Sequence, residues 1–248
     1  MNSEDQPIRP AATVIVVRDA KPQYEIFMLR RTSQAAFAGG MYVFPGGRVD
    51  DHDHAAGYTL HHKSPIDEQQ LQRDALGDDW RAYWIAGIRE TFEESGFLLA
   101  YDDADEIIDI DESNQSRFDE YRRRLHDGEV SLLDICGQEK LTLAIDLIHF
   151  YNRWITPSGR PRRFDTRFFI TKAPLVQSGL HDGKETVDSL WVSPDEALEL
   201  HGKDELGLMA VTQKQLSDFA QYKTADDFLQ MAAANTNFPT YRPAIPPK

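Results

Sequence analysis

The chain has 248 residues, 41% of them hydrophobic, which is enough to bury one core of ordinary size. A formal net charge of −14 at pH 7 argues against nucleic acid or an anionic membrane as the main partner. Cys136 is the single cysteine, so an intrachain disulfide is excluded and a reducing compartment is expected.

Two apolar segments near the amino terminus are predicted to pair as a β-hairpin. Residues 1–10 are polar and expected to be flexible. Residues 11–18 (AATVIVVR) predict a buried strand, and residues 24–30 (YEIFMLR) predict its partner. A short strand at residues 41–44 leads into the turn Pro45-Gly46-Gly47, where glycine permits positive φ and close backbone approach.

Residues 50–78 form a spacer that is rich in Asp and His. The acids and histidines alternate without a helical or strand period, so a solvated loop is favoured over a metal cluster. Asp50 is the exception, because it follows the Gly-Gly turn and is placed to support a metal site directly or through water. A short helix is expected at residues 71–76.

Residues 79–97, DWRAYWIAGIRETFEESGF, predict the central helix of the chain. Asp78 or Asp79 is expected to cap its amino end, and Gly96 occupies the position of a left-handed carboxyl cap. At about 100° per residue, one face is acidic and the opposite face is apolar. The acidic face carries Glu90, Glu93 and Glu94, and the apolar face carries Trp84, Ile85, Ile88 and Phe92.

Like charges at this spacing repel by roughly a few tenths of a kcal/mol per pair. Three carboxylates on one rigid face therefore favour a bound cation, and oxygen ligands suit Mg²⁺ or Mn²⁺. The commoner alternative for an acidic helix face is simple solvation.

Helices are predicted at residues 113–127, capped by Ser113, and at residues 130–137. The first carries three consecutive arginines at positions 122–124, for which surface salt bridges are favoured over phosphate contact. Cys136 lies among apolar neighbours in the second and is interpreted as a core residue.

A strand at residues 147–155 precedes an arginine-rich segment, RPRRFDTRFFI at residues 160–170. A guanidinium group can donate two hydrogen bonds to phosphate oxygens. This segment is therefore the best candidate in an acidic chain for attracting an anionic substrate. Arg163 and Arg167 are the leading candidates for substrate binding, and Arg48 and Arg31 complete the predicted set.

The remaining chain is predicted as a polar loop and strand at residues 181–193, a helix at 195–200 and mostly helix at 209–234. One domain over residues 11–235 is expected, with an insertion at 54–78, a helical addition at 113–138 and an extended Pro-rich tail at 236–248. No bilayer-spanning run or signal peptide is found, and the terminal Pro-Pro-Lys is not a peroxisomal address. A cytoplasmic location is expected, with a homodimer as one candidate assembly.

The segments FPGGRVDDHD (residues 44–53) and RETFEESGF (residues 89–97) resemble the two halves of the Nudix hydrolase box. Gly47 matches the glycine of the box, and Asp53 stands where the family usually has Glu. Residues 54–88 replace the seven residues that normally join the halves. This interruption, together with the WITP…RRFDTRFF pattern, is similar to the coenzyme A diphosphatase branch typified by a peroxisomal mammalian enzyme.

The resemblance implies an α+β fold in which a mixed sheet lies between helices, with a helical cap added. It also implies a metal-dependent hydrolase that cleaves the diphosphate bond of a nucleoside diphosphate linked to another group. Glu90, Glu93, Glu94 and the carbonyl of Gly47 would hold Mg²⁺ or Mn²⁺, and Arg89 would hold Glu93 in place. Glu185, with Asp182 second, or a helix carboxylate would be the general base.

Coenzyme A or acyl-CoA, cut to 3′,5′-ADP and 4′-phosphopantetheine, is the substrate that the interrupted box suggests. ADP-ribose, nucleotide sugars, dinucleoside polyphosphates and NADH remain open. A nucleotide sensor is disfavoured because all the helix acids are present. A Nudix-fold isomerase with a catalytic cysteine is disfavoured by the apolar setting of Cys136.

Overall fold

The computed structural model describes residues 6–35 and 38–243. Residues 1–5 of the expected flexible start and residues 244–248 of the Pro-rich tail lie outside these ranges. The strands are β1 (Ile8–Arg18), β2 (Glu25–Arg31), β3 (Tyr42–Val43), β4 (Gly46–Arg48), β5 (Ala100–Tyr101), β6 (Thr142–Leu143), β7 (His149–Ile155), β8 (Arg163–Lys172), β9 (Thr186–Val192) and β10 (Thr240–Tyr241). The α-helices are α1 (Gln70–Leu76), α2 (Trp80–Ser95), α3 (Gln115–His126), α4 (Leu132–Glu139), α5 (Pro194–Gly202), α6 (Ala210–Phe219) and α7 (Ala225–Ala233). Short 3₁₀ helices are η1 (Asp51–His54), η2 (Ala56–Leu60), η3 (Asp67–Gln69) and η4 (Ile145–Leu147).

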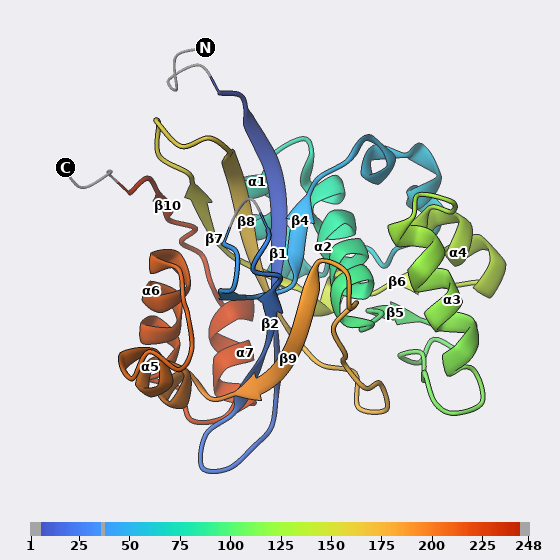
Figure 1. The fold of residues 1–248 in the computed structure, drawn as a ribbon. Coiled ribbons are helices and arrows are strands. Elements are labelled where there is room, and N and C mark those ends of the chain that lie inside the picture. The colour runs from blue at the N-terminus through green and yellow to red at the C-terminus, as the bar shows by residue number, and fades with distance from the viewer. Residues whose placement is uncertain (1–5, 36–37, 244–248) are drawn as a thin grey trace.

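A mixed sheet with the strand order β10-β7-β8-β1-β2-β3 forms the centre of the molecule (Figure 1). Strand β1 is its longest member and runs parallel to β8 from the pair Ile8–Arg163 to the pair Val17–Lys172. The strand therefore begins three residues before the expected start at residue 11, because the backbone of residues 8–10 pairs with β8.

The second edge of β1 is shared between two strands. β2 pairs with its carboxyl end at Val17 and Arg18, and β4 pairs with residues 11–13 near its amino end. Between them the amide of Val14 donates to the carbonyl of Pro45 at 2.9 Å. The predicted Gly-Gly turn is thus built into the sheet, where β2 diverges from β1.

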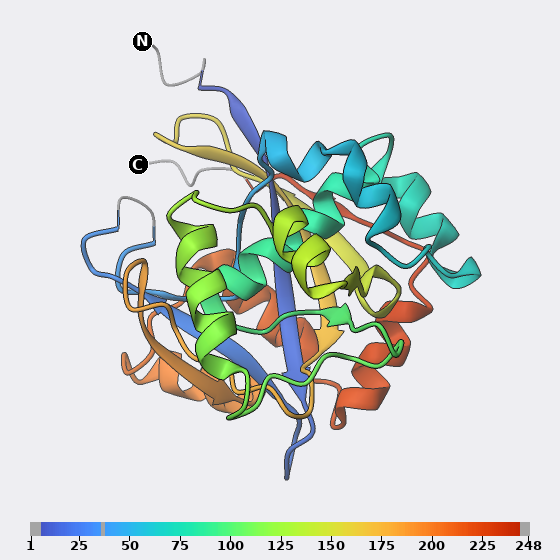
Figure 2. The same ribbon diagram turned by 90° about the vertical axis from the view of Figure 1, so that its right-hand side faces the viewer.

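Helices cover both faces of the sheet (Figures 1 and 2). The β-branched alternation of β1 explains this, because successive side chains point to opposite faces. Val14 and Val16 pack in one core with α2, whereas Ile15 and Val17 pack in the other with α6 and α7. The structure confirms the expected α+β class with a mixed sheet between helices.

The spacer is more ordered than the expected solvated loop. The expected short helix is confirmed as α1, but the residues before it fold into η1, η2 and η3, and the spacer contributes Tyr58 and Leu76 to the core beside α2. Asp53 is fully buried. The prediction failed because the alternation of polar residues gave no sign that one of these acids has a buried partner elsewhere.

Helix α2 begins and ends at the predicted cap residues, and only the capping bond at its amino end is absent. Gly96 adopts the left-handed conformation with φ of 80° and donates to the carbonyl of Phe92. Asp79 holds the amino-cap position without a side-chain capping bond, and its carboxylate lies 3.6 Å from His54. At the start of α3 the cap position belongs to Asn114 instead of Ser113.

Candidate active site

The acidic face of α2 rests against β4. The amide of Gly46 donates to the carboxylate of Glu94 at 2.9 Å. A Cβ atom on Gly47 would lie 2.4 Å from Oε1 of Glu90, so this backbone approach requires glycine. Glu94 is only 5% exposed. The acidic face is therefore covered by the glycine strand, and the alternative of a solvated face is wrong.

Burial makes these carboxylates costly to ionise. It raises the pKa of Glu90 to about 7 against the opposing effect of Arg89. Burial, followed by the negative charge of Glu90, raises the pKa of Glu94 well above its usual range. Burial also raises the pKa of Glu93. The nearby positive charge is thus too small to offset the effect of burial on the pKa values of these three carboxyl groups.

Arg89 is the cation that organises this face. Its Nε and Nη2 atoms donate to both oxygens of Asp53 at 2.8 and 2.9 Å. Its Nη1 atom donates to Glu90 at 2.9 Å and to Glu93 at 3.0 Å. Burial would lower the pKa of Arg89, but the hydrogen bond to Asp53 and the neighbouring carboxylates raise it. Arg89 therefore stays charged and orients two of the three helix acids.

Arg31 links the acidic face to the loop before β9. Its Nη1 atom lies 3.8 Å from Glu94, and its Nη2 atom lies 3.5 Å from Glu185. Asp182 accepts hydrogen bonds from the backbone amides of Lys184, Glu185 and Thr186 and so shapes this loop. Glu185 remains a candidate base near the site, whereas Asp182 is occupied in holding the loop.

The predicted arginines separate into two groups. Arg31 lies beside Glu94, and Arg48 lies 3.3 Å from Asp50 next to the glycine strand. Arg163 and Arg167 lie on β8, with β1 between them and β4. Arg167 pairs with Asp165 at 2.6 Å and stacks over the ring of Tyr83 at 4.3 Å.

Arg122 is a structural contact that the sequence did not reveal. From α3 it donates to the carbonyl oxygen of Glu93 at 2.8 Å and to that of Leu180 at 2.8 Å. The carbonyls in the last turn of a helix lack intrahelical partners, so Arg122 completes the end of α2. Its neighbours Arg123 and Arg124 form the expected salt bridges, with Glu120 at 2.7 Å and Glu129 at 3.5 Å.

The residues present fit a divalent cation, although no preformed cage exists. Within residues 6–35 and 38–243, no three Asp, Glu, His or Cys side chains already converge as a metal site. However, Glu90 and Glu94 repel one another, and Glu94 receives one amide and a distant guanidinium. Carboxylate and carbonyl oxygens are the ligands that hard divalent cations prefer, and such a cation would relieve this repulsion.

The profile of the NUDT19 Nudix domain family matches residues 8–217. The chain belongs to the Nudix hydrolase family. This Nudix hydrolase is 25% identical over 206 residues to the acyl-coenzyme A diphosphatase NUDT19 of Xenopus laevis and 26% identical over 248 residues to that of Gallus gallus. The alignments cover 71% and 82% of this chain, but 54% and 63% of those relatives.

A solved structure agrees with this assignment. The Nudix hydrolase from Alicyclobacillus acidocaldarius superimposes with a TM-score of 0.78 at 26% identity, over 91% of this chain and 97% of that chain. The comparisons confirm the fold, the Nudix family and the resemblance to the coenzyme A diphosphatase branch.

The setting of Cys136 bears on the alternative of an isomerase with a catalytic cysteine. Cys136 is fully buried in α4, and burial raises its pKa to about 12, which suits a core residue and not a nucleophile. In the described part of the chain, no helix has the length and apolar character needed to cross a bilayer.

Proposed function

We propose that this Nudix hydrolase cleaves the diphosphate bond of coenzyme A or acyl-CoA, giving 3′,5′-ADP and 4′-phosphopantetheine. The observation that carries the proposal is the set of buried carboxylates of α2 held against Gly46 and Gly47. The interrupted Nudix box and the names of the curated relatives support this choice of substrate.

Glu90, Glu93, Glu94 and the carbonyl of Gly47 would hold one or more Mg²⁺ or Mn²⁺ ions. Such an ion neutralises phosphate charge and lowers the pKa of a bound water. The chain supplies the positioning: Arg89 fixes Glu90 and Glu93, and the amide of Gly46 fixes Glu94.

Hydrolysis adds water across one P–O bond of the bridging diphosphate. Glu185 is the proposed acceptor of the proton that this water loses, because its carboxylate is more than half exposed and lies beside Arg31. Arg31 lies near Glu94 and Arg48 lies near Asp50, and both are the proposed partners of the developing phosphate charge.

A substrate panel tests this proposal. Coenzyme A, acetyl-CoA, ADP-ribose, a nucleotide sugar and NADH are each incubated with Mg²⁺ or Mn²⁺, and products are separated by chromatography. Coenzyme A or its thioester should have the highest kcat/KM and should yield 3′,5′-ADP. Rapid turnover of ADP-ribose with coenzyme A untouched would refute the substrate. Nucleotide binding without any product in the presence of metal would indicate a sensor.

A further inference from the structure

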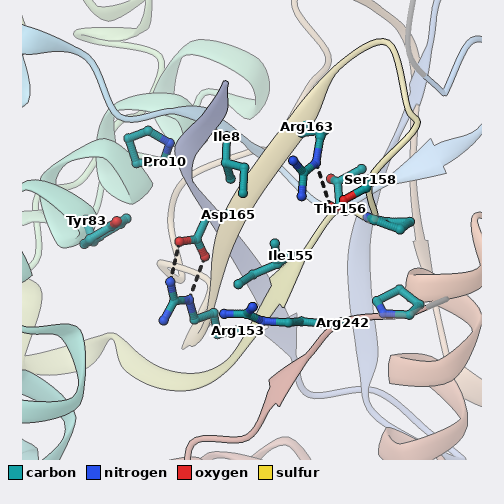
Figure 3. Close-up of a pocket in the computed structure, with 12 residues that line it drawn as sticks. Ile8, Pro10, Tyr83, Arg153, Ile155, Thr156, Ser158, Arg163, Asp165 and Arg242 are labelled. Carbon is teal, nitrogen blue, oxygen red and sulfur yellow. Dashed lines mark hydrogen bonds and ion pairs between the residues drawn. The ribbon is translucent and has the colours of Figure 1, made fainter. Parts of the chain in front are cut away.

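A cavity of about 700 Å³ lies at the amino end of β1, between the β7–β8 hairpin and the carboxyl-terminal segment (Figure 3). Its volume lies within the range of small-molecule sites. Ile8, Ile155 and Tyr83 contribute apolar surface, and Arg153, Arg163 and Arg242 contribute positive charge. We call this cavity the arginine pocket.

One of these arginines is already neutralised. Arg153 donates to both oxygens of Asp165 at 2.7 and 2.5 Å, and Asp165 also contacts Arg167 at 2.6 Å. Burial would raise the pKa of Asp165, but the hydrogen bonds from Arg153 and Arg167 bring it below its usual value. The single carboxylate of the arginine pocket therefore remains ionised and occupied by two partners.

The other two arginines keep their charge available. Nε of Arg163 donates to the carbonyl of Thr156 at 3.2 Å, which orients the guanidinium without neutralising it. The ion pairs found among residues 6–35 and 38–243 include neither Arg163 nor Arg242. The arginine pocket is thus a positive, partly apolar cavity in a chain with a net charge of −14.

Helix α2 connects the arginine pocket to the acidic face. Tyr83 precedes Glu90 by seven residues, so the two side chains lie on one side of the helix and about 10 Å apart along its axis. On β1, Gly47 pairs with Ala12, and Arg163 pairs with Ile8 four residues away, about 13 Å along the strand. One extended nucleotide is long enough to contact both places.

We propose that the arginine pocket binds the 3′-phosphate and ribose of a coenzyme A-type substrate, with Arg163 and Arg242 pairing with the phosphate. A guanidinium presents paired N–H donors that match phosphate oxygens, and apolar walls suit the sugar and base. In coenzyme A, one ribose separates this phosphate from the diphosphate, so the long side chain of Arg163 must extend toward the acidic face to meet it. The inference rests on the proposed function and identifies the group that distinguishes coenzyme A from ADP-ribose.

The kinetic test compares coenzyme A with dephospho-coenzyme A, which lacks the 3′-phosphate. The wild type should have the lower KM for coenzyme A. The double variant Arg163→Gln/Arg242→Gln should raise that KM about tenfold or more, the effect of losing one charge-assisted hydrogen bond. The ratio of the two KM values should then approach one. Arg160→Gln, on the same hairpin, is the matched control and should leave the ratio unchanged. A double variant that preserves the wild-type ratio would overturn the assignment.

A binding measurement without metal separates this inference from the catalytic proposal. Calorimetric titration should give tighter binding of 3′,5′-ADP than of 5′-AMP, and the double variant should abolish the difference. Equal affinity of the wild type for the two nucleotides would contradict the assignment. Inorganic phosphate that binds as tightly as 3′,5′-ADP would also contradict it, because the arginine pocket would then be a free-phosphate site. If coenzyme A is not hydrolysed, the proposed function fails. The titration still shows whether the arginine pocket binds the 3′-phosphate.

Discussion

Arg89 determines the arrangement of the acidic face at the scale of single residues. It is the one guanidinium that contacts Asp53, Glu90 and Glu93 together among the described residues. Its bidentate pair with Asp53 ties α2 to η1, and its remaining nitrogen ties the two helix acids to each other. Glu90 and Glu93 therefore depend on Arg89 for their positions, and Arg89 is in turn held by Asp53, which lies outside the helix.

Replacing Asp53 with Asn should destabilise the protein by about 3 kcal/mol, because Arg89 would remain buried without its closest counter-charge. Urea unfolding measures the loss. Asp51→Asn changes an exposed acid of the same 3₁₀ helix and should alter the free energy of unfolding by less than about 0.5 kcal/mol. Equal stabilities of the two variants would show that the Asp53–Arg89 pair is not structural.

Local patterns in the sequence predicted some of these residues and not others. The helix period placed Glu90, Glu93 and Glu94 on one face because that relation depends on neighbours within two turns. The pair of Arg89 with Asp53 joins residues 36 positions apart, and the contact of Arg122 with Glu93 joins residues 29 positions apart. Spacing within a segment contains no information about such partners.

At the scale of elements, the site depends on β4 entering the sheet where β2 leaves β1. The sequence predicted a Gly-Gly turn, and the structure shows a short strand whose backbone touches the acidic helix. The position of Gly46 is tight, since a Cβ there would lie 2.5 Å from the carbonyl of Ala12. The strand pairing was not predictable because three residues of Gly and Arg have little intrinsic strand propensity.

Gly47→Ala tests this contact between strand and helix. Gly47 is not among the glycines with positive φ, so the substitution should leave the backbone unstrained and displace the Glu90 carboxylate. The Kd for Mn²⁺ should rise about tenfold, equivalent to roughly 1.4 kcal/mol. Thermal denaturation checks that the fold survives. A Cβ atom added at Gly137 would have no neighbour within 4 Å, so Gly137→Ala is the matched control. Unchanged Mn²⁺ affinity in Gly47→Ala would exclude Glu90 from the metal site.

At the scale of the whole molecule, an acidic protein must attract an acidic substrate. Arg31 and Arg48 lie next to the acidic face, and Arg163 and Arg242 line the arginine pocket farther along α2. Both groups lie on one side of a sheet whose other face is covered by α5, α6 and α7 (Figure 1). Positive charge is thus concentrated locally against the net charge of −14.

The stability of the whole domain should fall in mild acid through His149. Burial lowers its pKa to about 4, and its Nδ1 atom has no hydrogen-bond partner among the described residues. His149 takes up a proton near pH 6.5 in the unfolded chain but not in the folded chain. Its effect on the free energy of unfolding is therefore absent above pH 6.5, and it lowers that free energy progressively as the pH falls toward 4. The loss is at most about 1.4 kcal/mol per pH unit. Urea unfolding between pH 7 and 4 should show a shallower decline in His149→Gln. Parallel curves for the two proteins would contradict this assignment.

The central claim is that Glu90, Glu93 and Glu94 hold the divalent cation that hydrolysis requires. Titration of Mn²⁺ into metal-free wild type, Glu93→Gln and Glu94→Gln, with coenzyme A hydrolysis measured on the same samples, tests it most directly. Each variant should bind Mn²⁺ at least about tenfold more weakly and lose at least about 99% of kcat, a change of roughly 2.7 kcal/mol, while remaining folded. Glu120→Gln removes an exposed acid of α3 and should match the wild type. Wild-type Mn²⁺ affinity and turnover in both Glu93→Gln and Glu94→Gln would contradict the account.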